Sequence, residues 1–167
     1  MNLVSRSAAI AGVVALSLAL PARGQDANDK IFADRAAASN MAELAEAKLA
    51  LDQSQNDNVR KFARRMIQDH GATGDALTTL AKVGGFGLPT TPTESRQKEI
   101  ARLRALTGAE FDRAYLNGQV TAHRDAVDLF LRESKSGSDS GLVHFAERAL
   151  PILNDHLQMA RSLAQAR

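Results

Sequence analysis

Apolar residues recur every three to four positions along most of the chain, which is the spacing of amphipathic α-helices. Capping residues, glycines and prolines divide this pattern into four long segments and one short one. The five helices are expected over about residues 29–52, 57–83, 92–106, 107–135 and 139–164. Thr91 and Thr107 are each followed three residues later by a glutamate, a capping box that predicts the starts of the short helix and the third long helix. The pattern therefore predicts an all-α protein.

The lengths of the connections predict how these helices are joined. Tight turns link the first long helix to the second and the third to the fourth, so each pair is expected to form an antiparallel hairpin. About 22 residues, including the short helix, separate the second long helix from the third. That length is enough for the chain to return along the bundle. We therefore expect a ferritin-like four-helix bundle with a short extra helix in the crossover, with a simple up-down-up-down bundle as the alternative.

The first 24 residues have the pattern of a secretory signal peptide. Arg6 precedes an apolar run over residues 8–20, and Ala22 and Gly24 fit the −3 and −1 positions of a signal-peptidase site. The apolar run is shorter than the roughly 20 residues that span a bilayer. We expect residues 1–24 to be removed and residues 25–167 to form one domain in the periplasm, without a transmembrane segment. An uncleaved N-terminal segment that holds the protein at the cell envelope is the alternative.

Charge and cysteine content exclude several classes of function. The chain has 21 Lys and Arg residues against 19 Asp and Glu residues, and two of the basic residues, Arg6 and Arg23, lie in the predicted signal peptide. The remaining domain has a formal net charge of zero, with both signs interspersed, so no nucleic-acid partner is expected. The chain has no cysteine, which excludes disulfides, thiol catalysis and a lipid anchor on cysteine.

Three histidines occupy the inward-facing stripes of three different predicted helices. His70, His123 and His156 each have apolar or small residues three and seven positions before them and four and seven positions after them. Each lies near the middle of its helix, so at a rise of about 1.5 Å per residue the three are expected in one layer of the bundle. In the first helix the polar residues at this height are Glu43 and Glu46. Three imidazoles and one or two carboxylates are therefore expected to converge.

This layer has two interpretations. Neutral imidazoles and a carboxylate are suitable ligands for Zn, Cu, Fe, Mn or Ni. An inward histidine, however, is more often a core residue that hydrogen-bonds a carbonyl, a hydroxyl or a carboxylate. From the residues alone we favour a metal-free His–Glu layer that fixes the register of the helices.

Two further details bear on the chemistry of the layer. The di-iron site of ferritin-like bundles needs Glu-x-x-His on two helices, whereas the residues three positions before these histidines are Ile67, Val120 and Leu153. A standard di-iron site is therefore not expected. Asp69 and Asp155 directly precede two of the histidines and point about 100° away on the helix. They are expected to orient imidazoles from outside the layer or to be solvated.

Five segments together resemble a known family. They read AAASNMAELAEAKLA, VRKFARRMIQDH, GLP, GAEFDRAYLNGQVTAHRDAVDLF and LPILNDHLQMARSLA. On these segments the chain resembles the exported bacterial proteins catalogued as domain of unknown function 4142, over about residues 31–164. Members often have Asp before the histidine of the third long helix, where this chain has Ala122. The resemblance implies export and a ferritin-like bundle, and it implies no established activity.

Two functions from different classes remain open. The favoured one is a non-catalytic, exported envelope protein, including one with a role in stress, whose partners are envelope proteins or other copies of itself. The alternative is a transition-metal-binding or metal-dependent redox protein that uses Zn, Cu, Fe or Mn held by His70, His123 and His156 with Glu43 or Glu46. Side chains that each pair with a local carbonyl or hydroxyl would favour the first function. Imidazole nitrogens that converge closely would favour the second.

Overall fold

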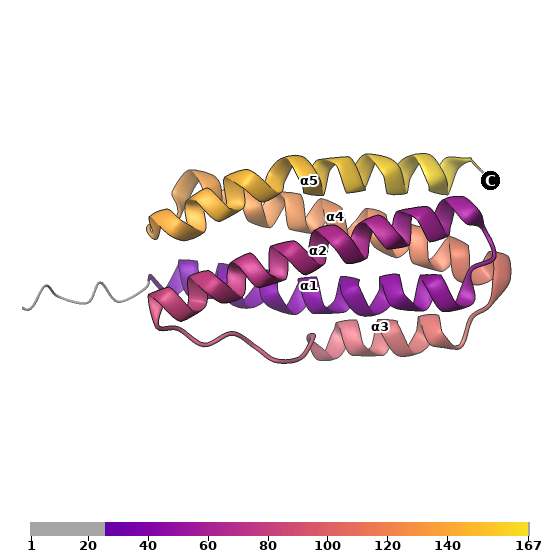
Figure 1. The fold of residues 1–167 in the computed structure, drawn as a ribbon, viewed down its shortest axis with the longest axis horizontal. Helices are drawn as coiled ribbons and strands as arrows, with labels where there is room; N and C mark the ends of the chain where they lie inside the picture. Colours follow the sequence, from indigo (N-terminus) through magenta and orange to yellow (C-terminus); the bar gives the residue numbers. More distant parts are fainter. Residues whose placement is uncertain (1–25, 167) are drawn as a thin grey trace, which may run out of the picture.

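The computed structural model describes residues 26–166, so the predicted signal peptide lies outside the described residues. Five helices account for nearly all of this range (Figure 1). They are α1 (Ala27–Gln53), α2 (Asp57–Gly84), α3 (Glu94–Arg104), α4 (Gly108–Ser136) and α5 (Ser140–Gln165). No strand occurs between residues 26 and 166, and the prediction of an all-α protein is confirmed.

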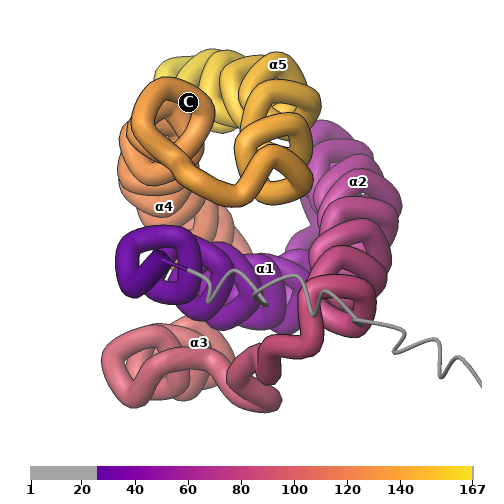
Figure 2. The backbone as a smooth tube through the Cα atoms, turned by 90° about the vertical axis from the view of Figure 1, so that its left-hand side faces the viewer, coloured from indigo at the N-terminus to yellow at the C-terminus, as the bar shows by residue number. Residues whose placement is uncertain are grey.

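The four long helices lie side by side, and α3 lies outside them. Tight turns make hairpins of α1 with α2 and of α4 with α5, as Figure 1 shows. In addition, α1 packs against α4 and α2 against α5, so the four helices enclose a common interior (Figure 2). The segment between α2 and α4 returns along the molecule, so these two helices run in the same direction. Along this return path, α3 packs mainly against α1.

Local sequence signals explain most of the helix ends, with two corrections. Thr107 precedes α4 as predicted, but its side chain makes no capping hydrogen bond. Asn56 caps α2, because its side chain accepts hydrogen bonds from two backbone N–H groups of the first turn. Gly85 ends the same helix in the left-handed conformation, at φ 68°. The predicted cap of the short helix was wrong: Thr93, rather than Thr91, accepts the backbone hydrogen bond, and α3 begins at Glu94.

The interior consists of two apolar clusters with a polar layer between them. The first cluster includes Phe32, Phe130 and Phe145, whose rings pack against one another. The second includes Phe62 and Met66 and fills the other half of the bundle. The two clusters are buried and cover the layer with apolar side chains at both of its ends along the bundle. None of the described helices is long and apolar enough to cross a membrane.

Candidate metal centre

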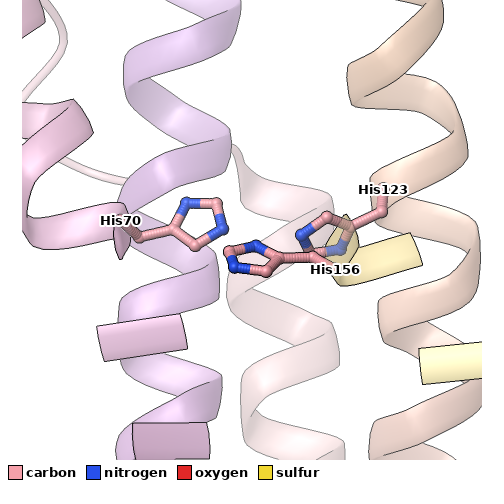
Figure 3. A group of neighbouring side chains, drawn as sticks. All are labelled: His70, His123 and His156. Carbon is pink, nitrogen blue, oxygen red and sulfur yellow. The ribbon is translucent and has the colours of Figure 1, made fainter. Parts of the chain in front are cut away.

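The structure brings His70, His123 and His156 together in this middle layer, from α2, α4 and α5. Their side chains point toward one another, as Figure 3 shows. The ring centroids are 5.6, 5.4 and 5.3 Å apart, and one nitrogen of each ring lies within 4.8 Å of the other two. All three residues are buried, with no more than 5 % of their surface exposed. The histidines predicted to share a layer therefore do so.

Two of the imidazoles are held by hydrogen bonds on the side that faces away from the centre. His70 Nδ1 donates to the side-chain oxygen of Asn40 on α1, at 3.0 Å. His123 Nδ1 donates to the backbone carbonyl of Gln119, one turn earlier in α4, at 3.0 Å. Asn40 fits because residue 74 is glycine: a Cβ there would lie 2.6 Å from the Asn40 amide nitrogen. In both rings Nδ1 carries the proton of this hydrogen bond, so Nε2 is the nitrogen that faces the centre of the layer.

The third imidazole is held from a neighbouring helix. His156 Nε2 donates to the carboxylate of Asp69 on α2, at 2.9 Å. Arg65 pairs with the same carboxylate. Although burial raises the pKa of Asp69, the hydrogen bonds from Arg65 and His156 outweigh it, and the pKa is lowered. An ionised Asp69 can only accept, so the proton stays on His156 Nε2 and Nδ1 is the inward atom.

Glu43 of α1 completes the layer. Its Oε2 lies 3.0 Å from His70 Nε2 and 3.4 Å from His123 Nε2. Its other oxygen accepts a hydrogen bond from Ser39. The four inward atoms are Glu43 Oε2, His70 Nε2, His123 Nε2 and His156 Nδ1. Glu43 Oε2 and His70 Nε2 pair with each other, whereas His123 Nε2 and His156 Nδ1 have no hydrogen-bond partner among the described residues. Buried polar atoms are rarely left without a partner.

Glu46, the other carboxylate predicted for this layer, has a different role in the structure. Glu46 is buried on the side of α1 that faces α3, and its Oε1 lies 2.8 Å from a guanidinium nitrogen of Arg96. Its Oε2 accepts a hydrogen bond from the side chain of Gln119, at 2.9 Å. Burial raises the pKa of Glu46 to about 7, with the charge of Arg96 opposing the rise. The structure therefore places Glu46 beside the layer rather than among the inward atoms.

The charges within the layer are unevenly distributed. Burial would raise the pKa of Glu43, but the charges of His123 and His70 outweigh it and hold the pKa far below its usual range. For His70 the charge of Glu43 outweighs burial and raises the pKa above 6.5. Burial lowers the pKa of His156 to about 4, and it also lowers the pKa of His123. In the metal-free protein Glu43 therefore favours a proton on His70, while burial favours the neutral forms of His123 and His156.

Three residues that matter to the site were missed by the sequence analysis. Asn40 and Gln119 hold imidazoles or carboxylates in place, and Arg96 reaches the layer from outside the four long helices. Asn40 and Gln119 are polar residues at the height of the histidines, a signal that could have identified them. Arg96 lies in a short, polar helix, and nothing in its local sequence distinguishes it from a solvated residue.

The fold is similar to those of several solved structures. A DUF305 fragment from Deinococcus radiodurans matches with a TM-score of 0.76 and 16% identity, covering 86% of this chain and 99% of that one. A DUF305 protein from Streptomyces coelicolor has a TM-score of 0.70 and 14% identity, with 81% and 89% covered. CopM in its Cu(I)-bound form has a TM-score of 0.70 and 13% identity, with 83% and 96% covered. At these identities the likeness shows the fold alone.

No curated protein matches the chain at a significant level. The profile of the family described as "Domain of unknown function (DUF4142)" matches residues 16–163, which include all three inward histidines and both glutamates. Because this match spans most of the sequence, the chain belongs to the DUF4142 family.

Proposed function

We propose that this protein binds one divalent transition-metal ion through His70 Nε2, His123 Nε2, His156 Nδ1 and Glu43 Oε2. One observation carries the proposal: one nitrogen of each buried histidine lies within 4.8 Å of the other two, at the centre of the bundle. Among the described residues His123 Nε2 and His156 Nδ1 have no hydrogen-bond partner, and Glu43 Oε2 pairs only with imidazole nitrogens. A metal ion accepts four lone pairs at once, which no hydrogen-bond donor in this layer can do.

The spacing of the inward atoms supports this proposal. Ligands of a tetrahedral ion at 2.0–2.1 Å lie about 3.3 Å from one another. Glu43 Oε2 is 3.0 and 3.4 Å from two of the imidazole nitrogens, which matches that spacing. The three nitrogens lie within 4.8 Å of one another, so small changes in side-chain torsion are needed to close around an ion. The outward hydrogen bonds of His123 and His156 already present their inward lone pairs, and binding of the ion displaces the inward proton of His70.

The donor set favours a borderline divalent ion. It consists of three imidazole nitrogens and one carboxylate oxygen, without sulfur, and such ligands suit Zn, Cu(II), Fe or Mn. The similar structure of CopM contains Cu(I), an ion for which soft thioether or thiolate ligands are preferred. One carboxylate and three neutral imidazoles carry a charge of −1, which partly balances a divalent ion. We therefore propose a divalent ion for this site rather than Cu(I).

The wider setting of the site is part of the proposal. We assign a ferritin-like topology, which is supported by the antiparallel hairpins and the long return between α2 and α4. We propose that residues 1–24 are a signal peptide and that residues 25–167 bind the metal in the periplasm. Metal binding without catalysis is the activity proposed. Envelope proteins or copies of the same chain remain the partners expected if the layer has only a structural role.

Elemental mass spectrometry of the untagged protein, purified from the periplasm, tests this proposal. We expect about one equivalent of a single transition metal, which His123→Ala should abolish. His144→Ala is the matched control, because His144 is exposed on α5 and lies outside the layer. A metal-free protein whose melting temperature does not change on addition of Zn, Cu, Mn or Fe would overturn the proposal. Full metal content in the His123→Ala variant would overturn the assigned ligands.

A further inference from the structure

A cavity of about 180 Å³ lies beside the candidate metal centre. Glu43 and His70 form part of its wall. The wall also includes five large apolar residues of the first hydrophobic cluster and the polar residues Ser39, Asn40 and Thr73; the five are Leu77, Leu129, Phe130, Phe145 and Leu153. The cavity therefore joins an apolar space to two residues of the polar layer.

Small residues on two helices leave this space open. Ala36 of α1 and Ala122 and Ala126 of α4 line the cavity, and all three are buried. A larger side chain at any of these positions would occupy the space that the alanines leave. Apolar cavities of about this size in proteins take up small apolar molecules or xenon.

The cavity also reaches the surface. Arg35 of α1 and Asp125 of α4 line it and are exposed, so its mouth lies between these two helices. Arg96 of α3 lines the same side, where it pairs with Glu46. A molecule from solution thus has a route past polar side chains into an apolar space that ends at Glu43 and His70.

We propose that this cavity binds a small, uncharged molecule, no larger than about the size of benzene, next to the metal. The inference rests on the proposed metal site, because the molecule would there add to the ion as a further ligand. The apolar inner part of the cavity disfavours ions, which would lose their hydration there without gaining a partner. The molecule would bind as a fifth ligand, an expansion that four-coordinate catalytic zinc sites undergo.

Xenon is the first probe, because it tests the cavity without the metal. The ¹²⁹Xe chemical shift of a solution of metal-free protein should change with protein concentration, as expected for one bound xenon. Ala126→Leu should abolish this change by filling the cavity. Ala101→Leu, on the exposed face of α3, is the control for the same substitution and should leave the change intact. If Ala126→Leu has a lower melting temperature than the wild type, the smaller substitution Ala126→Val is used in its place.

Nitric oxide is the second probe, because it reports access to the metal. Protein loaded anaerobically with one equivalent of Fe(II) should give the electron paramagnetic resonance signal of a ferrous nitrosyl. In Ala126→Leu or Ala126→Val with the same iron content, the signal should fall at least tenfold. Full iron content with an unchanged signal in these variants, or no xenon binding by the wild type, would overturn the cavity proposal alone. Failure to bind iron or any other transition metal would instead overturn the proposed function.

Discussion

Binding of Zn²⁺ at pH 5.5 is expected to release between one and two protons from this protein. The metal-free layer sets this number. Burial lowers the pKa of His70, but the charge of Glu43 outweighs it and raises the pKa above 6.5, so His70 is protonated at pH 5.5. Burial lowers the pKa of His156 to about 4, so His156 is neutral. Burial also lowers the pKa of His123 below 6.5, so His123 carries only part of a proton.

This number of released protons is compared with the number that three imidazoles of ordinary pKa would release. At pH 5.5 they would together carry about 2.7 protons, all of which a metal must displace to reach the lone pairs. Each displaced proton weakens the apparent affinity by about tenfold, or about 1.4 kcal/mol, for every pH unit below the pKa of the group. The affinity for the metal therefore increases as the pH rises, and it begins to decrease when the pH falls through the pKa of His70.

Isothermal titration calorimetry in buffers of different ionisation enthalpy measures the number of protons released. Glu43→Gln is the matched variant, because it keeps the shape of the side chain and removes the charge that holds the proton on His70. At pH 5.5 the variant should release fewer protons than the wild type. A release of about 2.7 protons by the wild type would refute the assignment of neutral His123 and His156. An unchanged release in Glu43→Gln would refute the role assigned to its charge.

Two further substitutions test one group beside the layer, Asp69, and one near the end of α4, Glu133. Asp69→Ala should weaken Zn²⁺ binding in a competition titration by about 10- to 100-fold, because His156 loses the acceptor that orients it. As a control, Asp155→Ala replaces the exposed residue next to His156 and should leave the affinity for Zn²⁺ unchanged. Glu133→Gln should stabilise the protein at pH 8 by about 1 to 2 kcal/mol, after a discount for solvent screening. Burial and the charge of Asp29 raise the pKa of Glu133 from 4.5 to about 7, so the wild type loses stability as the pH rises between these values. Urea unfolding should therefore show the gain at pH 8 and almost none at pH 4.5, and an equal gain at both would contradict this reasoning.

The helices and the height of the histidines were predictable because they depend on local spacing. The 3.6-residue period and the loop residues located all five helices. The rise per residue then placed His70, His123 and His156 at one level without any knowledge of how the helices pack. Only the start of the short helix was wrong. In the sequence Thr-Pro-Thr-Glu both threonines precede helical residues, and the choice between Thr91 and Thr93 depends on the path of the preceding loop.

The partners of the site residues were less predictable, because they depend on how each helix is rotated. Glu43 and Glu46 lie three residues apart on an alanine-rich helix, where apolar residues occupy most faces. Sequence therefore gave both residues as candidates, and packing directs one to the histidines and the other to Arg96. The hydrogen bond from His156 to Asp69 joins residues 87 positions apart, and no local pattern encodes it.

A hydrogen-bond layer and a metal centre make opposite demands on the inward atoms. In a layer that serves only to fix helix register, each inward nitrogen needs a donor or an acceptor opposite it, because a buried unpaired polar atom costs about 1–3 kcal/mol. The proton on His70 can serve Glu43, but His123 Nε2 and His156 Nδ1 then present lone pairs to each other without a donor among the described residues. The outward hydrogen bonds enforce this arrangement, since they fix the proton of each ring on the far nitrogen. A metal-free layer therefore needs a donor between these two lone pairs, whereas one cation would satisfy both of them and the carboxylate, and this is the physical reason for proposing the metal centre over the structural layer that the sequence alone favoured.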